Sequence, residues 1–279
     1  MGIRIIIDSA SDMVDCNRED VTFLPLSVIF GDTSYRDGID ISRKEFYEKL
    51  IESDEVPKTS QITPYEFGEA IKTAREAGEE VLVITLSSKL SGTYQSAVAA
   101  ASEYDEGVRV VDSANVSIGE YILVEYAIRL KDEGKSLSEI ASGLEKAREK
   151  IHVLALLDTL EYLKKGGRIS KAAAFAGGLL SIKPVIAIED GEVVVLGKAR
   201  GSKQGNNYLK EQIKKAGGVD YSMPYVLGYS GLDDSLLQKY IKDSEELWRE
   251  HTDKLDIILV GGTIGTHAGP GAIAVAFFA

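Results

Sequence analysis

Hydroxyl side chains gather where this chain could bind an anion. Ser91 and Thr93 flank Gly92, just after an apolar run that predicts a buried strand and before a helical pattern that continues to Ala101. Backbone N–H groups at such a helix start, together with the two hydroxyls, suit a carboxylate or a phosphate. Ordinary capping of the helix explains the same residues, so the pattern leaves both interpretations open.

A second polar segment, residues 58–61 with the sequence Lys-Thr-Ser-Gln, lies between Pro57 and a helix start expected at Thr63. Its position predicts an extended or turn-like segment at the carboxyl end of a sheet, which is where open α/β proteins bind ligands. The segment is consistent with contact to an anion and equally with a solvated loop.

The three histidines are His152, His251 and His267, and they show no metal-ligand spacing. His251 is expected to end a helix, where it would interact with the last carbonyl groups. His267 lies in the glycine-rich stretch 261–271, which predicts irregular backbone that another group approaches closely. The sequence therefore predicts no metal site, and it singles out the segment around His267.

Motifs of common enzyme classes are incomplete in this chain. Asp8 ends the first strand, but Ala10 stands where a phosphotransferase motif needs its second carboxylate, which excludes a metal-dependent phosphatase. A serine hydrolase could combine Ser91, His267 and Asp112, although Ser91 lacks the G-x-S-x-G elbow. Glycine loops of the standard nucleotide-binding types are absent from the sequence.

The basic segment 164–171, Lys-Lys-Gly-Gly-Arg-Ile-Ser-Lys, is unusual in an acidic chain. A helix end with Lys in its last turn, Gly as its cap and Ser170 as the next N-cap explains most of it. That interpretation does not account for Arg168, so binding of an anion or docking of a partner stays open.

The composition of the 279 residues, with 44% hydrophobic and 27% charged, predicts two globular domains. The net charge of −12 removes the attraction that nucleic acids and anionic membranes exert on proteins, so no nucleic acid and at most transient membrane contact are expected. Cys16 is the only cysteine, which excludes an intrachain disulfide. The sequence shows neither the apolar core of a signal peptide nor an apolar run long enough to span a membrane, so we expect a cytoplasmic protein.

Strand and helix patterns alternate in the first part of the chain. Apolar β-branched runs predict buried strands at 3–7, 21–29, 81–86 and 108–111. The helices between them begin with capping boxes at Ser42 and Glu45, Thr63 and Glu66, Ser117 and Glu120, and Ser136 and Glu139. This alternation predicts a mostly parallel sheet wrapped by helices.

The second part carries a hairpin signal, because the strand patterns 183–188 and 192–196 flank Asp190 and Gly191. Helices are expected at 202–215 and 234–251, and further strands at 225–229, 257–260 and 272–278. The fold class is therefore α/β, with a mostly parallel N-terminal domain at 1–150 and a mixed domain at 151–279. The interface between them is expected to enclose a ligand.

Six short motifs, in this order, resemble the DegV family across nearly the whole chain. They are Asp8-Ser9-Ala10-Ser11-Asp12, Lys58-Thr59-Ser60-Gln61, Leu90-Ser91-Gly92-Thr93-Tyr94, Gly166-Gly167-Arg168-Ile169-Ser170, Ile182-Lys183-Pro184 and His267-Ala268-Gly269-Pro270-Gly271. The departures are Ala10 and Ala268, where the family pattern has a hydroxyl residue. The resemblance implies a two-domain α/β protein that encloses one long-chain fatty acid.

The resemblance also implies which residues contact the ligand. Thr59 and Ser91 would hydrogen-bond the fatty acid carboxylate, with Thr93 and His267 as further contributors. Arg168 and Arg200 would lie near the mouth of the site.

By the same resemblance, the chain is a carrier and not an enzyme. It would hold an acid such as palmitate or oleate in an apolar tunnel, without another cofactor. It would present the acid to a separate ATP-dependent fatty acid kinase, which makes an acyl phosphate. Two alternatives remain at this stage, a Ser91-dependent lipid hydrolase and a binder of a small carbonyl compound such as dihydroxyacetone.

Overall fold

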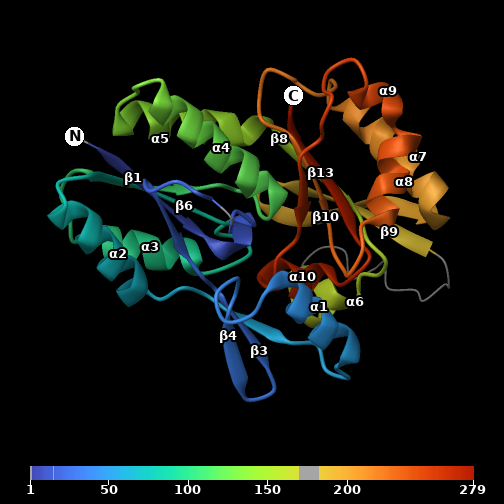
Figure 1. The fold of residues 1–279 in the computed structure, drawn as a ribbon, viewed down its shortest axis with the longest axis horizontal. Helices are drawn as coiled ribbons and strands as arrows, with labels where there is room; N and C mark the ends of the chain where they lie inside the picture. Colours follow the sequence, from blue (N-terminus) through green and yellow to red (C-terminus); the bar gives the residue numbers. More distant parts are fainter. Residues whose placement is uncertain (1, 15, 170–181) are drawn as a thin grey trace.

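Two β-sheets lie next to each other along the long axis of the molecule, and helices surround them (Figure 1). The structure is a computed structural model that describes residues 2–14, 16–169 and 182–279. The first sheet has the strand order β2-β1-β6-β7, and every neighbouring pair is parallel. Its strands are β1 (Ile3–Asp8), β2 (Val21–Leu24), β6 (Glu80–Thr85) and β7 (Val108–Asp112). The parallel sheet expected for the first part is confirmed.

The second sheet is mixed, with the strand order β10-β9-β8-β13-β11-β12. β11 and β12 pair in parallel, and the other neighbours pair antiparallel. Its strands are β8 (Ile151–Leu156), β9 (Ile182–Glu189), β10 (Glu192–Arg200), β11 (Val226–Tyr229), β12 (Ile257–Leu259) and β13 (Ile273–Phe278). The expected hairpin is confirmed: Asp190 at φ 50° and Gly191 at φ 78° form the tight turn between β9 and β10.

A small third sheet carries Thr59. It consists of β3 (Ser27–Phe30), β4 (Thr33–Arg36) and β5 (Lys58–Ser60), paired antiparallel in the order β4-β3-β5. The single strand expected at 21–29 is wrong, because the chain leaves the first sheet after Leu24 at Pro25. Proline has no N–H to donate to a ladder, and the N–H of Leu26 donates to Ser9 Oγ instead.

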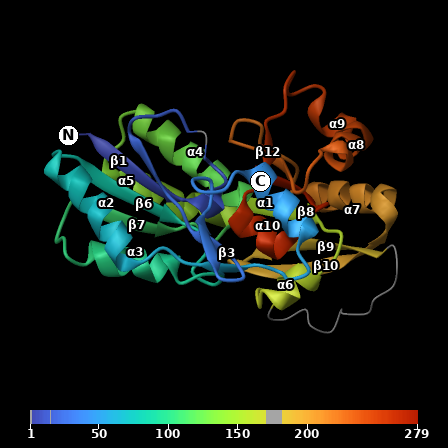
Figure 2. The same ribbon diagram turned by 60° about the horizontal axis from the view of Figure 1, so that its bottom comes forward.

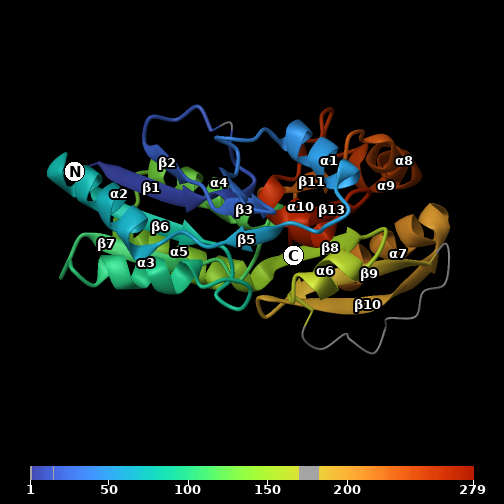
Figure 3. The same cartoon turned by 90° about the horizontal axis from the view of Figure 1, so that it is seen from below.

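Helices cover both faces of the parallel sheet. They are α2 (Pro64–Glu76) and α3 (Thr93–Ala101) on one face, and α4 (Ile118–Asp132) and α5 (Leu137–Ala147) on the other. Ile5 and Ile7 pack toward α4 and α5, whereas Ile6 and Val83 pack toward α2 and α3, as the alternation of side chains along a strand requires. Figure 1 shows the parallel strands between the two helix layers, and Figure 3 views the same sheet from the side of α2 and α3.

Three of the four predicted capping boxes are confirmed, at Ser42, Thr63 and Ser136. The first of these begins α1 (Arg43–Glu52). The box at Ser117 is wrong, although α4 does begin there. Ser117 has φ 56° and ψ −133° instead of an ordinary cap conformation, and its hydroxyl donates to Asp12 Oδ2. The carboxyl group of Glu120 is buried and has no hydrogen-bond partner among the described residues.

Helices of the second part differ in one place from the expectation. α7 (Gly201–Lys215) is confirmed, but the single helix expected at 234–251 is wrong. It divides into α8 (Ser235–Asp243) and α9 (Glu245–Trp248), because Ser244 leaves the helical conformation. His251 therefore does not end a helix, and its ring stacks on Tyr221 with 3.6 Å between the centroids.

The sequence predicted irregular backbone for the glycine-rich stretch 261–271. This prediction is wrong for most of the stretch, because α10 (Gly262–Ala268) forms within it. Two short 3-10 turns, Ser9–Ser11 and Arg148–Lys150, and α6 (Glu161–Lys165) complete the described elements. α10 packs against α1, as Figure 2 shows. A Cβ at Gly265 would lie 2.6 Å from Phe46 and 2.7 Å from Tyr47, so the glycine allows this close contact.

The two parts of the chain share one core. α4 packs with the first sheet and also with Val153 and Phe278 of the second. The last strand of the first sheet ends at Asp112, and the first strand of the second sheet begins at Ile151. This agrees with a domain boundary near residue 150, but the boundary itself stays a prediction.

Candidate functional site

A cavity of about 310 Å³ lies between the two sheets. We call it the central cavity. Most of its lining is apolar and comes from both parts of the chain: Leu26, Leu86, Leu90, Val116, Ile118, Val153, Ala155, Leu157, Ile186, Ile188, Val193, Val260, Ile264 and Ala274. A cavity of this size and character is typical of a site for one small molecule with an apolar body.

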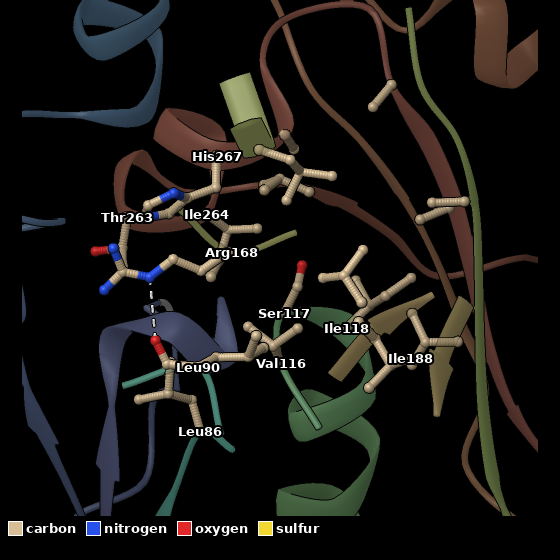
Figure 4. A pocket seen from close by; sticks show the side chains of 18 of the residues that line it. Leu86, Leu90, Val116, Ser117, Ile118, Arg168, Ile188, Thr263, Ile264 and His267 are labelled. Carbon is tan, nitrogen blue, oxygen red and sulfur yellow. Dashed lines mark hydrogen bonds between the residues drawn. The ribbon is translucent and has the colours of Figure 1, made fainter. Parts of the chain in front are cut away.

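Several polar side chains lie at one side of the central cavity. Figure 4 shows His267 and Arg168 on this side and Ile118 and Ile188 on the opposite side. Thr59 and Ser91 also line the cavity. The structure thus brings together four of the six residues that the sequence analysis proposed.

Thr59 on β5 contacts His267 on α10, with 3.1 Å between Thr59 Oγ1 and His267 Nε2. Burial, and next the positive charge of Arg168, lower the pKa of His267 to about 4. The imidazole is therefore neutral at pH near 7. Its Nδ1 is buried without a partner among the described residues. A Cβ at Gly166 would lie 2.1 Å from this Nδ1, so glycine leaves the room that the ring occupies.

Ser91 is paired with Thr93 in the turn before α3. Their hydroxyl oxygens lie 2.9 Å apart, and the N–H of Thr93 donates to Ser91 Oγ at 3.3 Å. Thr93 is fully buried and does not line the cavity, so it lies behind Ser91. Gly92 occupies the N-cap position of α3 without a side-chain cap bond, and Ser91 Oγ accepts the N–H of the first helical residue instead.

The segment of Thr59 is tied to the helix that follows Ser91. Gln61 Nε2 donates to Ser96 Oγ of α3 at 2.9 Å. A Cβ at Gly92 would lie 2.2 Å from Gln61 Oε1, so the two loops touch at this point. The two polar segments that the sequence placed at the sheet edge therefore meet.

Arg168 links the end of α6 to the loop before Ser91. Its Nε donates to Leu90 O at 3.1 Å, drawn as a dashed line in Figure 4, and its Nη1 donates to Gly166 O at 2.7 Å. Gly166 is the C-cap of α6, as the helix-end interpretation predicted. The predicted N-cap Ser170 lies outside the described residues.

Arg200 lies apart from the other proposed residues. It is exposed at the end of β10, and its backbone N–H donates to Gln204 Oε1. It lines neither the central cavity nor the polar pocket beside it. The expectation that Arg200 lies near the mouth of the site stays a prediction.

Two buried carboxylates, which the sequence analysis missed, hold α10 in place. Asp37 accepts the N–H groups of Gly262 and Thr263 at 2.9 and 2.8 Å, and Asp12 accepts that of Gly261 at 2.7 Å. Carboxylates satisfy the free N–H groups at a helix start well. Burial raises the pKa of Asp12 to about 6, although Arg43 opposes this shift. The partners are more than two hundred residues apart, so no local pattern indicates them.

A catalytic triad is not assembled from the residues proposed for a hydrolase. The hydroxyl of Ser91 pairs with Thr93, and His267 pairs with Thr59. Asp112 accepts backbone N–H groups of residues 88 and 114. Neither the histidine nor the aspartate is therefore in hydrogen-bond contact with Ser91.

Within the described ranges, no group of three or more His, Cys, Asp or Glu side chains is placed to hold a metal ion. Across the same residues, none of the helices combines the length and apolar character needed to span a bilayer.

Relatives of this chain match it from end to end. A family model described as DegV matches residues 2–279. A DegV domain-containing protein of Caldanaerobacter subterraneus subsp. tengcongensis is 35% identical over 280 residues, covering 99% of this chain and 98% of the relative. Another, from Clostridium perfringens, is 34% identical over 288 residues, covering 98% and 96%.

Solved structures with this fold include fatty-acid-binding proteins. A DegV family protein from Thermus thermophilus, described by its fatty acid binding, is 32% identical with a TM-score of 0.88, and both chains are covered completely. A stearic-acid-binding protein from Eubacterium ventriosum is 28% identical with a TM-score of 0.87, covering 100% of this chain and 98% of the other. Together with the family model, these matches confirm the resemblance seen in the sequence motifs. The chain belongs to the DegV family.

Proposed function

We propose that this chain binds one long-chain fatty acid, with the alkyl tail in the central cavity and the carboxylate at Thr59 and Ser91. The observation that carries the proposal is an apolar cavity with these two hydroxyls at the side where β5 and the loop before α3 meet. The fatty acids bound by the solved relatives from Thermus thermophilus and Eubacterium ventriosum support it.

The tail supplies most of the binding free energy in this proposal. Each buried CH₂ contributes about 0.8 kcal/mol, so roughly fifteen of them contribute about 12 kcal/mol before the costs of association. The apolar walls from both sheets would provide that burial as a tunnel for the tail. The polar end then orients the acid.

The carboxylate would accept one hydrogen bond from each hydroxyl. In this proposal His267 Nε2–H would donate to Thr59 Oγ1, which lies 3.1 Å away, and Thr59 would donate its own proton to the ligand. Thr93 would donate to Ser91 Oγ in the same way, which would leave the Ser91 hydroxyl proton for the second contact. Neutral donors satisfy the carboxylate without burying a permanent cation.

We further propose that the bound acid is the substrate of a separate ATP-dependent kinase. A carboxylate oxygen would attack the γ-phosphorus of ATP, the bond from that phosphorus to ADP would break, and an acyl phosphate and ADP would form. The carrier would position the nucleophilic oxygen, which is a large part of catalysis in phosphoryl transfer. In this role the chain is a lipid-binding subunit and not itself the enzyme.

Extraction tests the binding proposal directly. Protein purified gently is extracted with organic solvent, and the released molecules are identified by mass spectrometry. We expect one long-chain fatty acid per chain. After delipidation, added palmitate should raise the melting temperature, because a ligand of the folded state stabilises it by mass action. An empty protein that palmitate does not stabilise would rule the proposal out.

A further inference from the structure

A second pocket, of about 610 Å³, lies beside the polar side of the central cavity. We call it the outer pocket, and it is lined by residues 54–59, Lys165, Gly166, Arg168 and His267. Thr59, Arg168 and His267 line both spaces. The two pockets therefore meet at the position proposed for the carboxylate.

The outer pocket carries three cationic side chains. Lys58 and Lys165 are exposed, and neither has an ion-pair partner in the described part of the chain. Arg168 adds a third positive charge. Such a cluster is unexpected in a chain of net charge −12, and it suits an anionic ligand.

Two acidic residues, Asp54 and Glu55, also line the outer pocket. Both also line a smaller pocket with Leu50 and Glu161, whereas neither lines the central cavity. The acids thus lie toward the end of the outer pocket that is remote from Thr59 and His267. Lys165 lines that smaller pocket together with the acids, whereas Lys58 and Arg168 do not.

We infer that the outer pocket is a phosphate subsite, which holds the phosphate of an acyl phosphate whose tail stays in the central cavity. This inference rests on the proposed function. A free fatty acid ends at Thr59 and Ser91, but an acyl phosphate continues one phosphate group beyond its carbonyl. That group needs several charged donors, which two ammonium groups and a guanidinium supply.

The test compares two ligands with the same tail. One is palmitate, and the other is the β-ketophosphonate analogue of palmitoyl phosphate, in which a CH₂ replaces the bridging oxygen. The variant is Lys58→Gln/Lys165→Gln in delipidated protein. The matched control is Lys72→Gln/Lys164→Gln, which removes two exposed lysines that line neither pocket. Dissociation constants are measured by calorimetry at two salt concentrations.

We expect the outer-pocket variant to lose about tenfold in phosphonate affinity or more, which is about 1.4 kcal/mol, with little change for palmitate. The control should keep both affinities, and added salt should weaken wild-type binding of the phosphonate more than that of palmitate. Unchanged phosphonate affinity, or an equal loss for both ligands, would overturn the subsite. Inorganic phosphate is titrated in the same way. If the outer-pocket variant loses affinity for inorganic phosphate but not for the phosphonate, the pocket serves free phosphate and the subsite is overturned. Wild-type protein that binds no palmitate would instead refute the proposed function.

Discussion

Each hydroxyl proposed to face the carboxylate has a second polar group behind it. His267 supports Thr59, and Thr93 supports Ser91. The low pKa of His267 keeps the imidazole neutral, so the pair can orient a proton without trapping a charge when the cavity is empty. This arrangement predicts that the hydroxyls recognise the ionised head group more than the tail.

Removing the hydroxyls tests that role. Thr59→Val and Ser91→Ala should each weaken palmitate binding by about 1 to 3 kcal/mol, the usual effect of losing a hydrogen bond to a charged group. Binding of methyl palmitate, which has no carboxylate, should change less. Ser102→Ala, an exposed serine on the C-terminal side of α3, is the control. If both variants bind palmitate as tightly as wild type, the carboxylate lies elsewhere.

The space beside His267 gives a second residue-level prediction. Gly166→Ala should displace the imidazole, because the added methyl group would lie 2.1 Å from Nδ1. The bond to Thr59 should weaken, and we expect palmitate affinity to fall by about threefold. Gly68→Ala, where a Cβ meets nothing within 4 Å, is the control. Unchanged NMR signals of His267 in Gly166→Ala would show that the ring has not moved.

Turnover by a kinase should respond differently from binding. Arg168→Ala and His267→Ala should lower acyl phosphate formation about tenfold or more, with a smaller loss of palmitate affinity, because tail burial dominates the affinity. The assay combines the carrier with a kinase component, ATP and Mg²⁺, and hydroxylamine traps the product. Equal losses in both quantities would make the two residues simple ligand contacts.

At the scale of elements, α10 positions the site although it is one of the shorter helices. It carries His267 near its last turn, and its start is held by Asp37 and Asp12. The helix therefore depends on carboxylates from the first forty residues of the chain. α10 contacts β3 and β5 of the small third sheet, and in the chain it lies between β12 and β13 of the second sheet.

Loss of this anchor should affect stability and binding together. Asp37→Asn removes the negative charge and leaves one carbonyl oxygen for two N–H groups, so the free energy of unfolding should fall by about 1 to 3 kcal/mol. Palmitate affinity should fall as well, since α10 carries His267. Asp32→Asn, an exposed loop residue, is the control. A stable variant with normal affinity would show that packing alone holds α10.

Local patterns predicted the elements well where one residue type decides the conformation. The boxes at Thr63 and Ser136 and the Asp190-Gly191 turn are such cases. The patterns failed where a distant partner decides. Ser117 bonds Asp12 instead of capping α4, and contacts across the whole sequence fix α10. In the site, motif resemblance singled out Thr59 and Ser91, but no sequence signal indicated Asp37.

At the scale of the whole molecule, the central cavity exists because two sheets share a core without filling the space between their edges. The same region contains buried carboxyl groups near the ends of the parallel strands. Burial raises the pKa of Asp8 to about 7 and that of Asp12 to about 6, and it raises the pKa of Glu120 well above its usual value. Glu120 is flanked by the negative charges of Asp8 and Asp12, which oppose its ionisation further.

These groups predict how stability depends on pH. In the unfolded chain they release protons near pH 4, whereas the folded protein retains them up to about pH 6 to 7. The folded state therefore binds more protons in this interval, and the free energy of unfolding should fall as pH rises through it. His267 has the opposite sign, because its lowered pKa adds stability as pH rises between about 4 and 6.5. Burial lowers the pKa of His152 as well, so it acts in the same direction as His267. Together the two histidines offset only part of the effect of the carboxyl groups.

We expect delipidated protein to lose about 1 to 3 kcal/mol of unfolding free energy between about pH 5 and pH 7.5. Denaturant titrations at a series of pH values measure this. Glu120→Gln should flatten the profile at its upper end, since glutamine keeps the shape of the side chain but does not ionise. Glu103→Gln, at an exposed position, should leave the slope unchanged. A stability that rises steadily across this interval would mean that the buried carboxyl groups ionise with ordinary pKa values, and that their charge is balanced within the fold.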